Sequence, residues 1–115
     1  MLVARGQIYL ADFAVDMRKS IDGLMLLVKS EFGDSPATGA YYIFSNRKRD
    51  KLKVLYWDKS GFALWYKRLE KSCFKFRYGS GSKLQLSEDE FGWLLSGLDL
   101  HKTTGFTGLN YSVFA

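Results

Sequence analysis

Residues 51–68 read KLKVLYWDKSGFALWYKR and predict a β-hairpin. Aromatic and β-branched residues alternate with polar ones on both sides of a polar break, which is typical of paired strands. The break at 58–61 suits a four-residue loop in which Gly61 accepts a positive φ. The predicted strands therefore cover 51–57 and 61–69. The expected facing pairs are Trp57 with Phe62, Leu55 with Leu64, Lys53 with Tyr66, and Lys51 with Arg68.

This register divides the hairpin into two faces, because side chains alternate along a strand. One face is apolar near the loop and basic at its far end, where Tyr66 stands beside Lys53 and Arg68. The opposite face is the better candidate for the core. Its residues are Leu52, Val54, Tyr56, Ala63 and Trp65.

Before the hairpin, the spacing of apolar residues predicts a helix over 17–32. Asp16 is its expected N-cap, because the carboxylate can accept hydrogen bonds from the free amides of the first turn. Gly33 supplies the left-handed stop. Gly23 inside the helix costs about 1 kcal/mol relative to alanine, which indicates that something packs closely there.

The remaining elements follow from similar local signals. Further strands are expected at 7–11, 40–45 and 73–78, with a brief one at 84–86. Ser87 and Glu90 form a capping box and predict a second helix, which ends at Gly97 or Asp99.

The elements together predict the order β-α-β-β-β-β-α and an α+β fold. We expect a single domain over residues 1–100, with an antiparallel sheet of about four to six strands and both helices packed on one face. Residues 101–115 show no period and are expected to form a tail. No apolar run approaches the ~20 residues of a membrane span, so we expect a cytoplasmic protein without a membrane partner.

Positive charge is concentrated in the middle of the chain. Residues 47–77 carry eleven Lys or Arg and three acids, a net charge of +8. The other residues carry six basic and nine acidic side chains, so the whole chain is +5. This pattern indicates a polyanion or an acidic protein surface as partner. The alternative is that the lysines keep an exposed sheet soluble and block edge pairing.

Residues suited to catalysis are few. His101 is the only histidine, so a histidine-based triad or a two-histidine metal site cannot form within one chain. Cys73, the only cysteine, stands among strand residues and is typical of a small buried hydrophobe. We therefore expect no catalysis by this chain alone, no cofactor and no bound metal.

Recognition is the remaining role, since basic strands with interleaved aromatics can hold a phosphate backbone and stack exposed bases. The candidate nucleic-acid-binding residues are Arg47, Lys48, Arg49, Lys51, Lys53, Tyr66, Lys67 and Arg68. Arg18 and Lys19 stand at the start of the predicted helix, where its dipole favours acids. They therefore indicate a partner contact or an ion pair with a neighbouring acid.

Three separated blocks also carry a resemblance to a known family. They are DMRKSIDGL at 16–24, FSNRKRDKLKVLYWD at 44–58, and GF at 61–62 followed by KRLE at 67–70. The ending, LQLS at 84–87 with LLSGLD at 94–99, agrees with them. In order and spacing, the stretch from about residue 7 to Asp99 resembles the Orf2/TnpB-like accessory proteins of insertion-sequence-66 type bacterial transposable elements.

The resemblance implies an auxiliary protein encoded beside a separate, larger transposase that carries the catalytic acids. Two hypotheses follow. In the first, the basic hairpin at 47–53 contacts DNA at the ends of the element, supported by Tyr66, Lys67 and Arg68. In the second, the protein is an adaptor whose charged hairpin docks on the transposase without contacting DNA.

Overall fold

The computed structural model describes residues 2–79 and 81–98. The strands are β1 (Ile8–Ala14), β2 (Tyr41–Ser45), β3 (Lys51–Asp58), β4 (Gly61–Arg68) and β5 (Lys83–Leu86), and the helices are α1 (Ile21–Leu27) and α2 (Glu88–Leu95). The predicted order and the α+β class are confirmed. The tail predicted at 101–115 lies outside the described residues. Among the described helices, none has the length and apolar character needed to cross a membrane.

The sheet is mixed, with the strand order β4-β3-β2-β1-β5. Strands β1 and β2 pair in parallel, whereas the other three pairs are antiparallel. The helical segment between β1 and β2 carries the chain back along the sheet, so that both strands run in the same direction. The expected antiparallel arrangement therefore holds for all pairs but this one.

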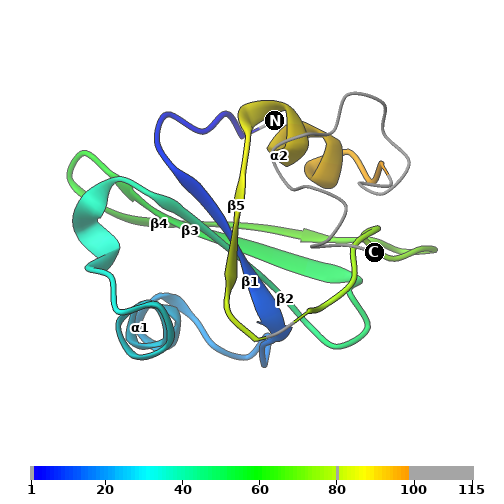
Figure 1. Ribbon diagram of the computed structural model, residues 1–115, viewed down its shortest axis with the longest axis horizontal. Helices are drawn as coiled ribbons and strands as arrows, with labels where there is room; N and C mark the ends of the chain where they lie inside the picture. The colour runs from blue at the N-terminus through cyan, green and yellow to red at the C-terminus, as the bar shows by residue number, and fades with distance from the viewer. Residues whose placement is uncertain (1, 80, 99–115) are drawn as a thin grey trace.

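The two helices cover opposite faces of the sheet, as Figure 1 shows with α2 above and α1 below. Leu24 and Val28 share one buried cluster with Phe44 of β2. Phe91 of α2 belongs to a second cluster with Ile43 of β2. The prediction that both helices share one face is wrong, because every residue of β2 is buried and both faces need a cover.

The β3–β4 hairpin has the predicted register, including the pairing of Lys53 with Tyr66. Its loop is shorter than expected, since Asp58 pairs with Gly61 and only two residues turn the chain. Lys59, rather than Gly61, takes the positive φ, at 54°. Such two-residue loops match the twist of the flanking strands.

The first helix begins at Ile21, later than predicted, with Ser20 at the N-cap position. Asp16 does not cap it, because its carboxylate accepts hydrogen bonds from the backbone and side chain of Arg18. The helix continues as a π-helical turn, Val28–Phe32. It then stops at Gly33, whose φ of 68° confirms the predicted left-handed stop.

The close neighbour expected at Gly23 is the stem of Lys19. A Cβ on Gly23 would lie 3.3 Å from the Lys19 Cβ and Cγ. In the second helix, the predicted capping box of Ser87 and Glu90 is present. Gly97, with a φ of 81°, follows its last turn as expected.

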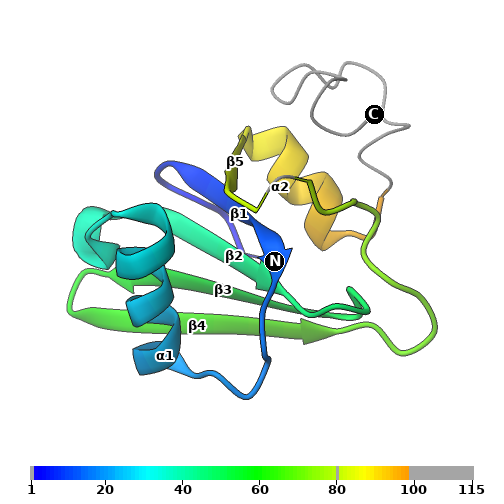
Figure 2. The ribbon, with the colours of Figure 1, turned by 60° about the horizontal axis from the view of Figure 1, so that its bottom comes forward.

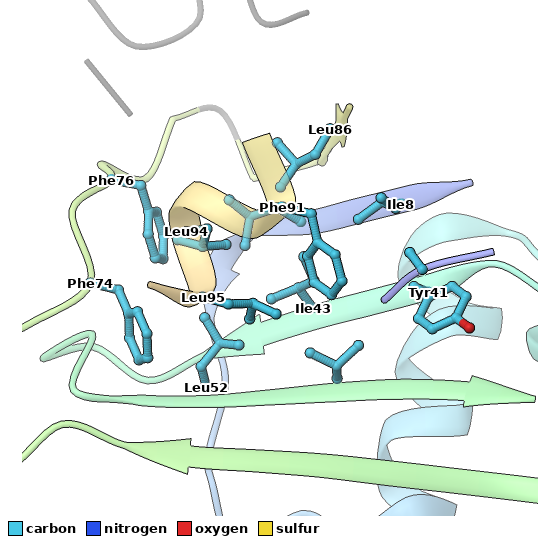
Figure 3. Close-up of a cluster of buried hydrophobic side chains, with 13 residues drawn as sticks. Ile8, Tyr41, Ile43, Leu52, Phe74, Phe76, Leu86, Phe91, Leu94 and Leu95 are labelled. Carbon is cyan, nitrogen blue, oxygen red and sulfur yellow. The ribbon is translucent and has the colours of Figure 1, made fainter. Parts of the chain in front are cut away.

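The strand predicted at 73–78 is absent, and the segment is irregular. Its two phenylalanines, Phe74 and Phe76, alternate with exposed residues, and this alternation imitates a strand. Both rings are instead buried in one cluster with Phe91, Leu94 and Leu95, and Figure 3 shows them at the side of α2. Figure 2 shows the segment passing close to the β2–β3 turn, where the Phe74 N–H donates to the Arg49 carbonyl oxygen at 2.6 Å. The brief strand predicted at 84–86 is β5.

We expect Phe74→Ala to lower the free energy of unfolding by about 3 to 5 kcal/mol, because a fully buried ring leaves a cavity. The matched control is Lys75→Ala at the exposed neighbouring position, which should change the free energy of unfolding by less than about 0.5 kcal/mol. Urea unfolding of both variants measures the difference. Equal costs would show that ring burial does not hold this segment in place.

Candidate nucleic-acid interface

An open groove lies at the end of the sheet where β3 begins and β4 ends. Its volume is about 550 Å³, and its lining residues are Val15, Asp16, Met17, Arg18, Asn46, Arg47, Lys48, Lys51 and Tyr66. We call it the basic groove. One wall is the turn before α1, the other is the β2–β3 turn, and Tyr66 comes from the edge strand β4. The groove thus brings together predicted site residues that are far apart in the sequence.

Asn46 shapes the turn that carries Arg47 and Lys48. Its Oδ1 accepts hydrogen bonds from the backbone N–H groups of Asp50 and Lys51, at 3.1 and 3.2 Å. Its Nδ2 donates to the Asp50 carboxylate at 2.6 Å and thereby holds the pKa of that carboxyl below its usual value. Arg47 and Lys48 remain exposed. Asn46 is not among the candidate residues named from the sequence, although an asparagine that opens a polar turn is a signal for this role.

Arg49 connects the same turn to the irregular segment at 73–78. Its Nη1 donates to the Phe76 carbonyl oxygen, and its own carbonyl oxygen accepts from the Phe74 N–H. The residue is half-buried and has a φ of 58°. Its side chain is therefore engaged within the fold and does not line the basic groove.

Lys53 joins the turn before α1 to the sheet. Its Nζ donates to the carbonyl oxygens of Met17 and Lys19, at 2.8 and 2.7 Å. The same Nζ lies 5.7 Å from the centre of the Tyr66 ring, within cation–π range. Lys53 thus orders one wall of the groove and a ring beside it, while its own hydrogen bonds stay inside the protein.

The last two candidates on β4 have other partners. Lys67 Nζ donates to the Leu95 carbonyl oxygen at 2.9 Å, at the C-terminal end of α2, where a cation is favoured. Lys67 therefore reaches the face of the sheet opposite to the groove. Arg68 is exposed and pairs with Glu70 at 2.7 Å, and this partner raises the pKa of its guanidinium.

Of the two residues before α1, Arg18 lines the groove and Lys19 does not. Arg18 Nη2 lies 2.6 Å from Asp16 Oδ2, which confirms the expected ion pair with a neighbouring acid. Contrary to the expectation from the sequence, Arg18 and Lys19 do not stand in the first turn of a helix, because α1 begins only at Ile21. The groove is lined by four cations and one carboxylate, so the net charge of its lining is positive. One of these cations, Lys51, also pairs with the neighbouring Asp50 at 3.6 Å.

Groups suited to metal binding or nucleophilic chemistry do not gather at the groove. Within residues 2–79 and 81–98, no three or more His, Cys, Asp or Glu side chains are placed to hold a metal ion together. Cys73 is a half-buried free thiol. His101 lies outside the part of the chain that the structure describes.

We expect Lys53→Met to lower the free energy of unfolding by about 1 to 3 kcal/mol, because it removes two charge-assisted hydrogen bonds. Methionine retains an aliphatic side chain of similar length, so the packing of that chain is kept. Lys48→Met at the exposed turn is the control and should cost less than about 0.5 kcal/mol. Thermal or urea unfolding compares the two. A cost at Lys53 no greater than that at Lys48 would contradict a structural role for Lys53.

Arg18 lowers the pKa of Asp16 from 3.8 to about 2, chiefly through its side-chain hydrogen bond. The pair therefore stabilises the fold fully above pH 3.8, and this contribution is lost as the pH falls through about 2. We expect carboxyl-carbon NMR to give a midpoint near 2 for Asp16. Arg18→Gln should move it upward toward 3.8, whereas Lys19→Gln, which removes only a nearby charge, should move it less. Equal midpoints in the two variants would argue against the hydrogen bond as the cause.

Comparisons with known proteins agree with the resemblance seen in the sequence. The family described as IS66 Orf2 like protein matches residues 6–105. The uncharacterised protein y4jC of Sinorhizobium fredii is 37% identical over 93 residues, covering 81% of this chain and 80% of the relative. The uncharacterised protein y4hO of the same organism is 30% identical over 93 residues, covering 81% of each chain. No solved structure gives a significant match. The chain therefore belongs to the IS66 Orf2-like family and is an accessory protein of transposition.

Proposed function

We propose that this protein assists transposition by binding DNA at the ends of the element through the basic groove. The observation that supports this most directly is the convergence of Arg18, Arg47, Lys48 and Lys51 around one open groove. Phosphates attract clustered cations and release their own counterions on binding, so such a site suits a polyanion.

The proposed contact is narrower than the full set of basic residues. Arg49, Lys53 and Lys67 donate hydrogen bonds to backbone carbonyl oxygens of the protein, so we exclude them from the phosphate contact. Arg68 does not line the groove and is paired with Glu70, so we treat it as a secondary contact. Arg47 and Lys48 protrude from a turn held by Asn46, which presents their charges without disturbing the core.

We assign strand cleavage and joining to the separate transposase and not to this chain. The scarcity of candidate catalytic groups, with a single histidine and a single cysteine, supports this division of labour. Arg18 and Lys19 remain candidates for contact with that transposase. Arg18 is paired with Asp16 but is still highly exposed, so a partner can reach it.

A salt titration tests the proposed contact. If the groove engages about three phosphates, affinity for element-end DNA should fall with a log–log slope of about −2 to −3. The combined variant Arg47→Gln, Lys48→Gln, Lys51→Gln should weaken binding and bring the slope close to zero, with a nearly unchanged melting temperature. Fluorescence anisotropy without transposase measures both quantities.

The matched control removes three charges elsewhere, in the variant Arg5→Gln, Lys29→Gln, Lys59→Gln. These residues are exposed and do not line the groove, so the parental slope should be nearly retained. If both variants lost DNA affinity equally, net charge alone would explain the effect, and the groove would not be the contact. A parental protein with no DNA affinity at low salt would contradict the proposal and favour the adaptor on the transposase.

A further inference from the structure

The basic groove contains one large aromatic side chain, that of Tyr66. Tyr66 is 48% exposed, whereas Tyr56, Trp57 and Phe62 of the same hairpin each contact another ring. Tyr56 stacks on Tyr41 with 4.8 Å between ring centres, and Trp57 meets Phe62 edge-on at 5.0 Å. Among the described residues, the Tyr66 ring has the Lys53 ammonium as its neighbour and no aromatic partner.

The surroundings of the Tyr66 ring are held in place before any ligand arrives. Tyr66 pairs with Lys53 across the β3–β4 ladder. Lys53 Nζ is itself fixed by the carbonyl oxygens of Met17 and Lys19. Such a preorganised site loses little conformational freedom on binding.

Charge is distributed unequally around this ring. Arg47 and Lys48 of the β2–β3 turn and Lys51 at the start of β3 form one wall, where Lys51 pairs with Asp50 at 3.6 Å. The opposite wall carries the Asp16–Arg18 pair. The Asp16–Arg18 wall carries no net charge, so a phosphate is attracted more strongly by the wall that holds Arg47 and Lys48. A nucleotide would therefore place its phosphate toward the turn and its base over Tyr66.

We propose that the basic groove takes an unpaired nucleotide, so that the protein prefers single-stranded or frayed DNA to intact duplex. This inference rests on the proposed function and names the form of DNA that the groove recognises. In a duplex the base faces are stacked on their neighbours and inaccessible, whereas an unpaired base can stack on an exposed aromatic side chain. The groove volume of about 550 Å³ is that of a small-molecule site, which matches one nucleotide.

The experiment compares a short single-stranded oligonucleotide with the duplex of the same sequence, at one fixed salt concentration, by fluorescence anisotropy. We expect the single strand to bind at least about fivefold more tightly, the smallest ratio typical of one base–aromatic stack. Tyr66→Leu should lose about fivefold or more on the single strand and less than about twofold on the duplex. Tyr66→Phe, which keeps the ring, should bind both forms like the parent.

Phe62→Leu is the matched control, because Phe62 lies on the same strand and the same face but at the opposite end of the hairpin. It should leave both affinities unchanged, and circular dichroism checks that each variant folds. Equal binding of both DNA forms, with Tyr66→Leu unchanged and the Arg47/Lys48/Lys51 variant impaired, would overturn this inference and leave the proposed function standing. No affinity for either form at low salt would overturn both.

Discussion

The burial of β2 on both of its faces is the constraint on which the rest of the structure depends. All five residues of Tyr41–Ser45 are buried, so the sheet cannot leave either side of its centre open to water. One helical segment must cover each face, and the β1-α1-β2 connection and α2 do so. The two layers cover the centre of the sheet, and the basic groove lies at its end, where β3 begins and β4 ends.

Hydrogen bonds from basic side chains to the protein's own backbone decide how much of the basic segment is available to a partner. The side chains of Arg49, Lys53 and Lys67 each donate to carbonyl oxygens that are distant in sequence. These bonds satisfy backbone acceptors outside the regular ladders and connect the loops to the sheet. The net charge of residues 47–77 therefore overstates the charge that faces a ligand.

Local signals in the sequence predicted which side chains of the candidate site are exposed. The exposed turn residues Arg47 and Lys48, and the exposed ring of Tyr66, follow from strand parity and from the polar turn. The roles of Lys53 and Lys67 could not be predicted, because Met17, Lys19 and Leu95 are their partners and lie far along the chain. Sequence spacing carries no information about such contacts until the sheet is assembled.

The sequence by itself determined the features that neighbouring residues decide. The hairpin register, the stop at Gly33 and the capping box at Ser87 depend on alternation, on a left-handed glycine and on a hydrogen bond across three residues. Only the tertiary structure decided the parallel β1–β2 pair, the opposite placement of the helices and the irregular segment at 73–78. The alternating pattern of residues 73–78 suits either a paired strand or a loop with two buried rings. The choice between them depends on which surface the rest of the fold leaves open to Phe74 and Phe76, because apolar burial favours no particular backbone partner.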